Sequence, residues 1–171
     1  MADNNPFSQA LNSDYPALGF RFKVTFNGIA GNVSCPFQTV SMLSVTNKSV
    51  LIVDGGDNAK EYKLPTKHKF KDVKLVRGLM TNNIQLLRWL DNLGLDESGR
   101  IKTAIVVIEL LNTDNSNQII TIEKWSLYDC FPTSFSLGEF NSQKNAIVLE
   151  TITLAYSKYE RESVGGHLNY Y

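Results

Sequence analysis

The chain has 171 residues, of which 43% are hydrophobic and 20% are charged, a length and balance that suit one globular domain with its own core. Lys and Arg together number 17, as do Asp and Glu, so the formal net charge is zero. This argues against a dedicated nucleic-acid-binding protein, which is usually clearly basic. A chain without net charge is also poorly protected against self-association.

The sequence gives no sign of a targeting or membrane segment. Its N-terminus lacks a basic region followed by an apolar run, so no signal peptide is visible. No apolar stretch is long enough to span a bilayer, so we expect no membrane partner. The two cysteines, Cys35 and Cys130, are too few for a disulfide framework. One disulfide stays open, but two reduced, half-buried thiols in a cytosolic protein are favoured.

Three segments follow from composition along the chain: an N-terminal arm over 1–18, a single β domain over 19–160 and a C-terminal tail over 161–171. The arm is polar and contains two prolines. The tail contains Gly165 and Gly166 and ends on two tyrosines.

The first part of the domain predicts several strands. Phe20 to Phe26 alternates strictly between aromatic or apolar and polar residues, the pattern of a half-buried strand. A loop is expected over 28–36 and a weaker strand over 37–43. A further strand over 49–53 leads into a glycine-tipped loop over 54–58, and the chain is extended again until Pro65.

A strand over 73–76 precedes the one helix that we expect, over 82–93. Thr81, Asn82 and Asn83 offer an N-cap, and Gly94 suits the position after the last turn. We expect Trp89 on this helix to pack in the core.

The rest of the domain predicts strands over 101–111, 119–128 and 146–159, with a hairpin loop over 112–117. Thr121, Glu123 and Trp125 are expected on one face, and Phe131-Pro132 is expected to end the pairing. Glu150 is expected on the apolar face of the last strand. The fold class is therefore mainly β, an antiparallel barrel or sandwich with one short α-helix.

No motif points to catalysis, a cofactor or a metal. His68 and His167 lie in no zinc-binding spacing, the cysteines form no CxxC pair, and nucleophile-elbow, dinucleotide and phosphate-loop motifs are missing. A nucleophilic pair of Cys130 and His68 has no support in the spacing. The carboxylates in turns and at the helix end suit solvated or capping roles: Asp54, Asp57, Asp91, Asp96 and Glu97. We predict that the protein is not an enzyme.

A run of lysines surrounds His68, at positions 60, 63, 67, 69, 71 and 74. It suits contact with an acidic partner surface or nucleic acid, or the solvated face of an exposed strand. The zero net charge and the scarcity of aromatic residues between the lysines favour the second interpretation.

Several segments, in order, carry a family resemblance. Tyr15 to Val24 resembles an opening "YP…FRFxV" strand. Lys63-Leu64-Pro65 with Val73 to Gly78 resembles a "KLPG…ITLKRG" element, although Thr66 stands where the family often has Gly. Leu86 to Leu90 is similar to the helix that follows, Trp125 with Pro132 to a "W.l..a.P" strand, and Asn145 to Tyr156 to the last strand. The chain thus resembles the tail-tube proteins of contractile phages and related contractile injection systems.

The resemblance implies a hexameric ring in which each subunit adds strands to an inner barrel, and rings that stack into a hollow tube inside a sheath. Implied partners are further copies of the chain, the sheath protein, baseplate and terminator proteins, and a protein or DNA cargo in the lumen. Assembly would occur in the bacterial cytoplasm or an infected host cell, and the product would be a phage virion or an extracellular injection particle. Faces carrying Arg21, Lys23 and Thr25, or Thr121 and Glu123, could line the lumen.

The segment over 50–64 suits either a disordered surface hairpin or the contact between rings that the resemblance implies. The apolar residues Val50 to Val53 favour the contact, because they are too apolar for a free loop. The predicted interface residues are Val50, Leu51, Ile52, Val53, Gly55, Gly56, Leu64 and Arg77. Two alternatives stay open: a tube-initiator paralogue next to the baseplate, and a monomeric β-barrel that binds a small ligand.

Overall fold

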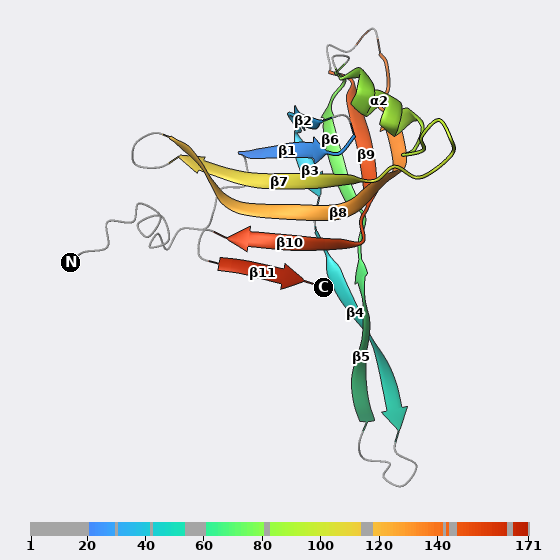
Figure 1. The fold of residues 1–171 in the computed structure, drawn as a ribbon, viewed down its shortest axis with the longest axis vertical. Helices are drawn as coiled ribbons and strands as arrows, with labels where there is room; N and C mark the ends of the chain where they lie inside the picture. Colours follow the sequence, from blue (N-terminus) through green and yellow to red (C-terminus); the bar gives the residue numbers. More distant parts are fainter. Residues whose placement is uncertain are drawn as a thin grey trace, which may run out of the picture.

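The structure is a computed structural model, and it describes residues 21–29, 31–41, 43–53, 61–80, 83–113, 118–141, 143, 147–163 and 166–170. The predicted fold class is confirmed, because these residues form mainly antiparallel strands with one short helix between two groups of strands. Figure 1 shows two sets of strands that cross in the body of the molecule and a long hairpin that projects from it.

The first set of strands runs in the order β2, β1, β7, β8, β10, β11. The bounds are β1 Phe22–Asn27, β2 Asn32–Cys35, β7 Ala104–Thr113, β8 Ile119–Leu137, β10 Lys158–Ser163 and β11 Gly166–Tyr170. The predicted alternation of the first strand is confirmed: Val24 and Phe26 are fully buried while Lys23 is exposed. Strict alternation gives this sheet one apolar and one polar face.

The second set follows from β8, whose later half pairs with β9 (Leu149–Ala155). β9 pairs with β6 (Val73–Gly78), and β6 pairs with β3 (Thr39–Ser41). The 19-residue β8 therefore belongs to both sets and joins them. Between its two parts Asp129 adopts a positive φ of 54°, and Asp129 Oδ2 accepts a hydrogen bond of 2.5 Å from Ser157 Oγ.

The core lies between the two sets of strands and beneath the helix α2 (Ile84–Asp91), which covers one end of the body (Figure 1). Trp89 packs in this core as predicted, edge-on to Phe26 at 6.3 Å between ring centroids. Its indole Nε1 donates to the carbonyl oxygen of Lys102 at 2.7 Å. The helix ends where Leu93 and Gly94 take positive φ values and the Gly94 N–H bonds the Trp89 carbonyl. Asn83 makes no side-chain capping bond, and its Nδ2 donates to Cys35 Sγ instead.

The hairpin is a separate two-stranded sheet of β4 (Val45–Val53) and β5 (Glu61–Phe70). The strand that we predicted to stop at Pro65 continues to Phe70. A register shift between Asn47 and Ser49 lies opposite Pro65, where a proline without an N–H is tolerated. Thr66, the departure from the family pattern, lies within the strand and donates from its hydroxyl to the Lys48 carbonyl at 2.7 Å.

Four further expectations of secondary structure were wrong. The loop predicted over 28–36 contains β2. Pairing does not end at Phe131-Pro132, because β8 changes partner there from β7 to β9, with a register shift after Pro132. The strand predicted over 146–159 is divided into β9 and β10 at Tyr156 and Ser157. The segment predicted as a tail pairs instead, as the end of β10 and as β11.

Candidate assembly surfaces

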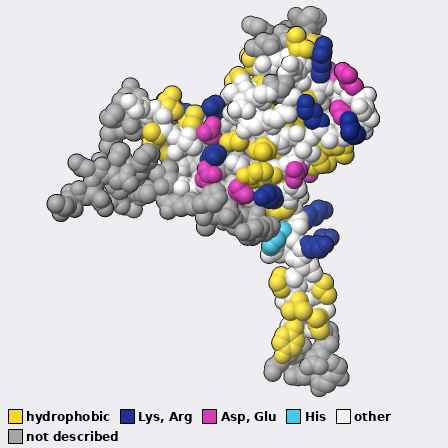
Figure 2. Space-filling model, viewed as in Figure 1, with side chains coloured by type: hydrophobic (Ala, Val, Ile, Leu, Met, Phe, Trp, Pro, Cys, Tyr) yellow, Lys and Arg dark blue, Asp and Glu magenta, His cyan; other side chains and the backbone are white. Residues whose placement is uncertain are grey.

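One face of the hairpin is apolar and has no cover in the described part of the chain. Val50 lies opposite Leu64 and Ile52 lies opposite Tyr62, so these four side chains share one face. They are 53%, 50%, 47% and 52% exposed, respectively. Figure 2 shows hydrophobic side chains gathered on the part of the hairpin farthest from the body. The face forms a strip of apolar surface of the kind that marks an interaction site.

The part of the hairpin next to the body is basic instead. Lys48, Lys67 and Lys69 are exposed there, and Figure 2 shows Lys or Arg side chains beside His68. His68 Nδ1 lies against Asn47 Oδ1 across the two strands. The described lysines of the run are exposed in the single subunit, which both interpretations of the run expect, so the choice between them stays a prediction.

The predicted interface residues do not all lie together. Val50, Leu51, Ile52 and Leu64 lie on the hairpin, with Leu51 on the opposite face beside Lys63. The Val53 backbone ends β4, while its side chain and both Gly55 and Gly56 lie outside the described residues. Arg77 is the exception, because it is buried in the body.

Arg77 is 1% exposed and forms an ion pair through its Nε with Glu150 Oε1, whose residue is fully buried. The guanidinium also lies 5.4 Å from the centroid of the Phe37 ring. Among the described residues, Arg77 Nη1 and Nη2 and Glu150 Oε2 have no hydrogen-bond partner. The prediction of Arg77 as a contact residue is therefore corrected, because its side chain is buried and cannot reach a neighbouring subunit. Arg77 instead neutralises the buried Glu150 carboxylate on the apolar face of β9.

A row of alternating charges crosses the polar face of the first set of strands. Lys23, Glu109, Lys124 and Glu162 face one another in register on β1, β7, β8 and β10. Lys23 Nζ lies 3.6 Å from Glu109 Oε2, and Lys124 Nζ lies 2.9 Å from Glu162 Oε2. Sequence reasoning missed this row. Each charge stands at an alternate position of its strand, but the row appears only once the register is known.

A second charged group lies on the same face. Tyr128 donates from its hydroxyl to Glu160 at 2.6 Å, and Lys158 Nζ lies 3.2 Å from Glu160 and 4.5 Å from the centroid of the Tyr128 ring. The hydrogen bond to Glu160, with smaller effects of burial and nearby charge, raises the pKa of Tyr128. The three lysines and three glutamates of the two groups together carry no net charge.

Thr121 and Glu123, predicted to share a face, do not. The register shifts between Leu110 and Leu111, which leaves Ile122 without a partner on β7. Thr121 then reaches the polar face and its hydroxyl lies 3.4 Å from Glu109, while Glu123 binds Arg161 on the other face. Arg161 donates to Glu123 from Nε at 2.8 Å and from Nη2 at 3.1 Å, and lies 5.9 Å from the Trp125 ring.

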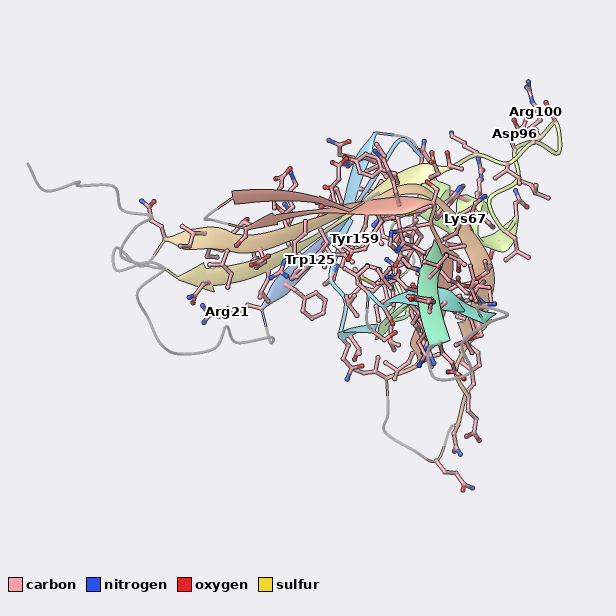
Figure 3. All side chains as sticks on the ribbon, turned by 90° about the horizontal axis from the view of Figure 1, so that it is seen from below. Arg21, Lys67, Asp96, Arg100, Trp125 and Tyr159 are labelled. Carbon is pink, nitrogen blue, oxygen red and sulfur yellow. The ribbon has the colours of Figure 1, made fainter. Side chains whose placement is uncertain are left out.

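A groove opens between the apolar face of the first set of strands and β3 of the second set. It has a volume of about 390 Å³. Figure 3 shows Trp125 and Tyr159 on the underside of the sheet in this region. The groove is lined by Phe22, Gln38, Thr39, Val40, Leu43, Ile108, Leu110 and Trp125.

The residues that could have carried chemistry are dispersed. Cys130 is 1% exposed, and burial raises the pKa of its thiol to about 12, whereas His68 is exposed on the hairpin. Both cysteines are free and more deeply buried than predicted. Asp96 accepts hydrogen bonds from the Ser98 and Arg100 backbone in the loop that Figure 3 labels, a structural role. In the described ranges, no group of acidic, His and Cys side chains could hold a metal, and no helix could cross a membrane.

Comparisons with known proteins agree with this architecture. A profile of the family described as "T4-like virus tail tube protein gp19" matches residues 18–160. The chain is similar to one in the cryo-EM structure of the anti-feeding prophage baseplate, with 26% identity and a TM-score of 0.75, covering 88% of this chain and 98% of that one. A search of curated proteins gave no significant match.

Two further structures share the fold. One is a chain of the PVC sheath-tube complex, an extracellular contractile injection system, with 22% identity, a TM-score of 0.72 and coverage of 91% and 97%. The other is an Hcp protein, with 15% identity, a TM-score of 0.57 and coverage of 87% and 99%. Since the family profile spans most of the chain, this protein belongs to the T4-like tail tube family and is a structural tail tube protein of phage tails or contractile injection systems rather than an enzyme.

Proposed function

We propose that the chain forms hexameric rings that stack into the hollow inner tube of a contractile particle, through which a cargo passes. Family membership supports a tube-forming role. The related chains come from a six-fold symmetrised baseplate and from a sheath-tube complex, which supports the symmetry and the surrounding sheath.

The observation that carries the proposal is the apolar face of the hairpin. Val50, Ile52, Tyr62 and Leu64 stand about half exposed on a two-stranded sheet that projects from the body (Figure 1). A single copy gains little from such a strip, and burial against another copy would remove it from water. We assign it, with the segment over 54–58, to the contact between rings.

Open strand edges support ring formation. Within the described residues, β2 pairs with Val24 to Asn27 only, so no strand lies against Phe22 and Lys23 on that side of β1. At the other edge, β11 pairs only with β10. Unpaired edges invite pairing with another chain, and a closed ring of identical head-to-tail contacts would leave no such edge open.

The polar face of the same sheet is the candidate wall of the lumen. This face carries Lys23, Thr25 and Thr121. Glu123 lies on the opposite face, because the register shifts between Leu110 and Leu111. Its two charged groups consist of paired side chains and have no net charge. Such a face suits a water-filled channel that neither attracts nor repels a charged cargo strongly. Protein and DNA both remain candidate cargoes.

Further partners would be the sheath protein and the baseplate and terminator proteins, with assembly in the bacterial cytoplasm or an infected host cell. The similarity to a chain in a baseplate structure also favours a second candidate, a tube initiator next to the baseplate. The monomeric ligand-binding alternative has less support, since the family is one of tail tubes.

Negative-stain electron microscopy of the purified protein tests the proposal. Long tubes would support the inner-tube function, and isolated rings would support the tube initiator. A monomer of 19.2 kDa by light scattering would refute both functions. Deleting residues 54–58 should shorten the tubes and leave rings intact. Tubes of unchanged length would show that residues 54–58 are not needed for the contact between rings.

A further inference from the structure

The groove beside β3 is apolar and is only partly filled by the described residues. Six of the eight residues that line it are hydrophobic or aromatic, and Phe22, Val40 and Trp125 among them are only partly buried. Its volume of about 390 Å³ is in the range of pockets that hold a small ligand. Filling such a groove with apolar side chains would be favourable, because it removes both surfaces from water.

The N-terminal arm joins the described chain beside this groove. The carbonyl oxygen of Arg21 accepts a hydrogen bond of 2.9 Å from the Leu111 N–H, and the next residue, Phe22, lines the groove. Figure 3 shows Arg21 and Trp125 in this part of the molecule. The arm, residues 1–18, lies outside the described ranges, but Leu18 stands three residues before Arg21. The two Cα atoms are therefore within about 11 Å of each other whatever path the chain takes.

The sequence of the arm suits an apolar groove. Large apolar side chains recur at intervals of four, four and three residues, at Phe7, Leu11, Tyr15 and Leu18. Polar residues fill most of the positions between them. This spacing places apolar side chains on one side of a helical segment, which Pro16 would end near Tyr15. The arm can thus present apolar side chains to the groove and polar ones to water.

The charges of the arm and of the surface beside the groove are complementary. The arm carries Asp3 and Asp14 and has no Lys or Arg. In the groove wall, Leu43 is followed by Ser44, whose carbonyl oxygen accepts a hydrogen bond of 3.0 Å from the N–H of the exposed Lys71. The basic part of the hairpin therefore begins beside the groove, and its lysines would attract the carboxylates of the arm.

We propose that the N-terminal arm of each chain docks in the groove of the same chain. Its apolar side chains pack against Phe22, Leu110 and Trp125, and its carboxylates lie towards the lysines of the hairpin. The short connection to Arg21 gives the arm a higher effective concentration at its own groove than at that of another copy. Docking covers the groove of a single subunit and provides the lysine run with an acidic partner in the same chain. The inference does not rest on the proposed function.

Disulfide trapping in the full-length chain tests the docking. One variant combines Ser13→Cys in the arm with Gln38→Cys at the groove, and a second combines Ser8→Cys with Thr39→Cys. Gln38 and Thr39 are both exposed groove residues, so neither substitution disturbs the core. The native cysteines are buried, and the unmodified chain gives the baseline.

The matched control combines Ser13→Cys with Thr121→Cys. Thr121 pairs with Leu111, whose N–H bonds the Arg21 carbonyl, so it lies as close to the attachment of the arm as the groove does. It stands on the polar face of the sheet, away from the groove. An arm that moves freely would reach both faces, and an excess of trapping at the groove therefore reports docking.

After mild oxidation, each groove variant should lose two of its four thiols, while the denatured protein keeps the mass of one chain, 19.2 kDa. The control should keep its thiols. Adding Leu18→Ser to the first variant should reduce the trapped fraction, whereas Asn12→Ser should leave it unchanged, because only the first substitution removes an apolar side chain.

Two results would overturn the docking. Groove variants that trap no more than the control would show that the arm does not occupy the groove. A disulfide-linked band of twice the mass of one chain would give the groove to the arm of a second copy. Electron microscopy of the unmodified chain tests the proposed function separately, so tubes without trapping, or trapping without tubes, would refute one proposal and leave the other.

Discussion

The β4–β5 hairpin and the sheet of β1, β7 and β8 are both antiparallel and alternate apolar with polar residues, yet they use the alternation differently. In the sheet, Val24, Phe26 and Val106 point to the core and are fully buried. In the hairpin, the corresponding side chains of Val50 and Ile52 are about half exposed. Alternation therefore specifies a strand with two faces, whereas the rest of the fold decides whether the apolar face is covered within one chain.

This difference predicts a division of energetic roles. Apolar side chains of the body stabilise the folded subunit, since their burial removes them from water. Those of the hairpin add little to the subunit and would stabilise contacts between subunits. The following substitutions test the division, from the largest expected effect to the smallest.

Replacing Arg77 by Met should destabilise the subunit most. The substitution leaves the Glu150 carboxylate buried without a counter-charge, which costs about 3–5 kcal/mol of unfolding free energy. Urea unfolding of the subunit measures the change. The double variant Arg77→Met with Glu150→Leu is the control and should recover most of the loss; a double variant as unstable as the single one would show that the pair is not the cause.

Leu75→Ala and Leu64→Ala compare the two regions directly. Leu75 is fully buried, so its truncation should cost about 2–5 kcal/mol through lost burial and a cavity. Leu64 is 50% exposed, so the same change in the hairpin should stay within about 0.5 kcal/mol in the isolated subunit. Thermal unfolding of both variants gives the contrast, and equal losses would contradict the division of roles.

Lys124→Gln should have a smaller effect, because the charge row on the polar face is partly exposed. Loss of the pair with Glu162 should cost about 0.2–1 kcal/mol, and the loss should shrink at high salt. Lys63→Gln on the hairpin provides the matched control and should change the unfolding free energy less. A salt-independent effect at Lys124 would argue that packing, rather than charge, is responsible.

The smallest effect is a pH dependence at Glu123. The hydrogen bond from Arg161 holds the pKa of Glu123 below its ordinary value of 4.5, and burial opposes the shift. A carboxyl with a lowered folded pKa adds stability above its unfolded pKa, and this contribution is lost as the pH falls through the folded pKa. Glu123→Gln should therefore be less stable than the unmodified protein at neutral pH, and the difference should vanish in acid. Urea unfolding of both proteins from neutral to acidic pH measures this difference in stability. A difference that stays constant over the whole range would exclude the linkage.

Much of the candidate surface follows from local sequence. The apolar run Val50 to Val53 predicted a strand with an apolar face, and β4 carries Val50 and Ile52 on such a face; the contact that we assign to it stays a prediction. Arg77 could not be assigned in the same way. Its neighbours in sequence are those of an exposed strand end, and only the pairing of β6 with β9 brings Glu150 opposite it.

Sequence alone thus determined the helix, most of the strands, the apolar face of β1, the core position of Trp89 and the family, because hydrophobic periodicity and motif order are local properties. The tertiary structure decided the partner exchange of β8, the charge row, the pairing of Arg77 with Glu150 and the groove beside β3. Each of these depends on register between strands distant in sequence, and a shift of one residue, as between Leu110 and Leu111, moves side chains to the opposite face.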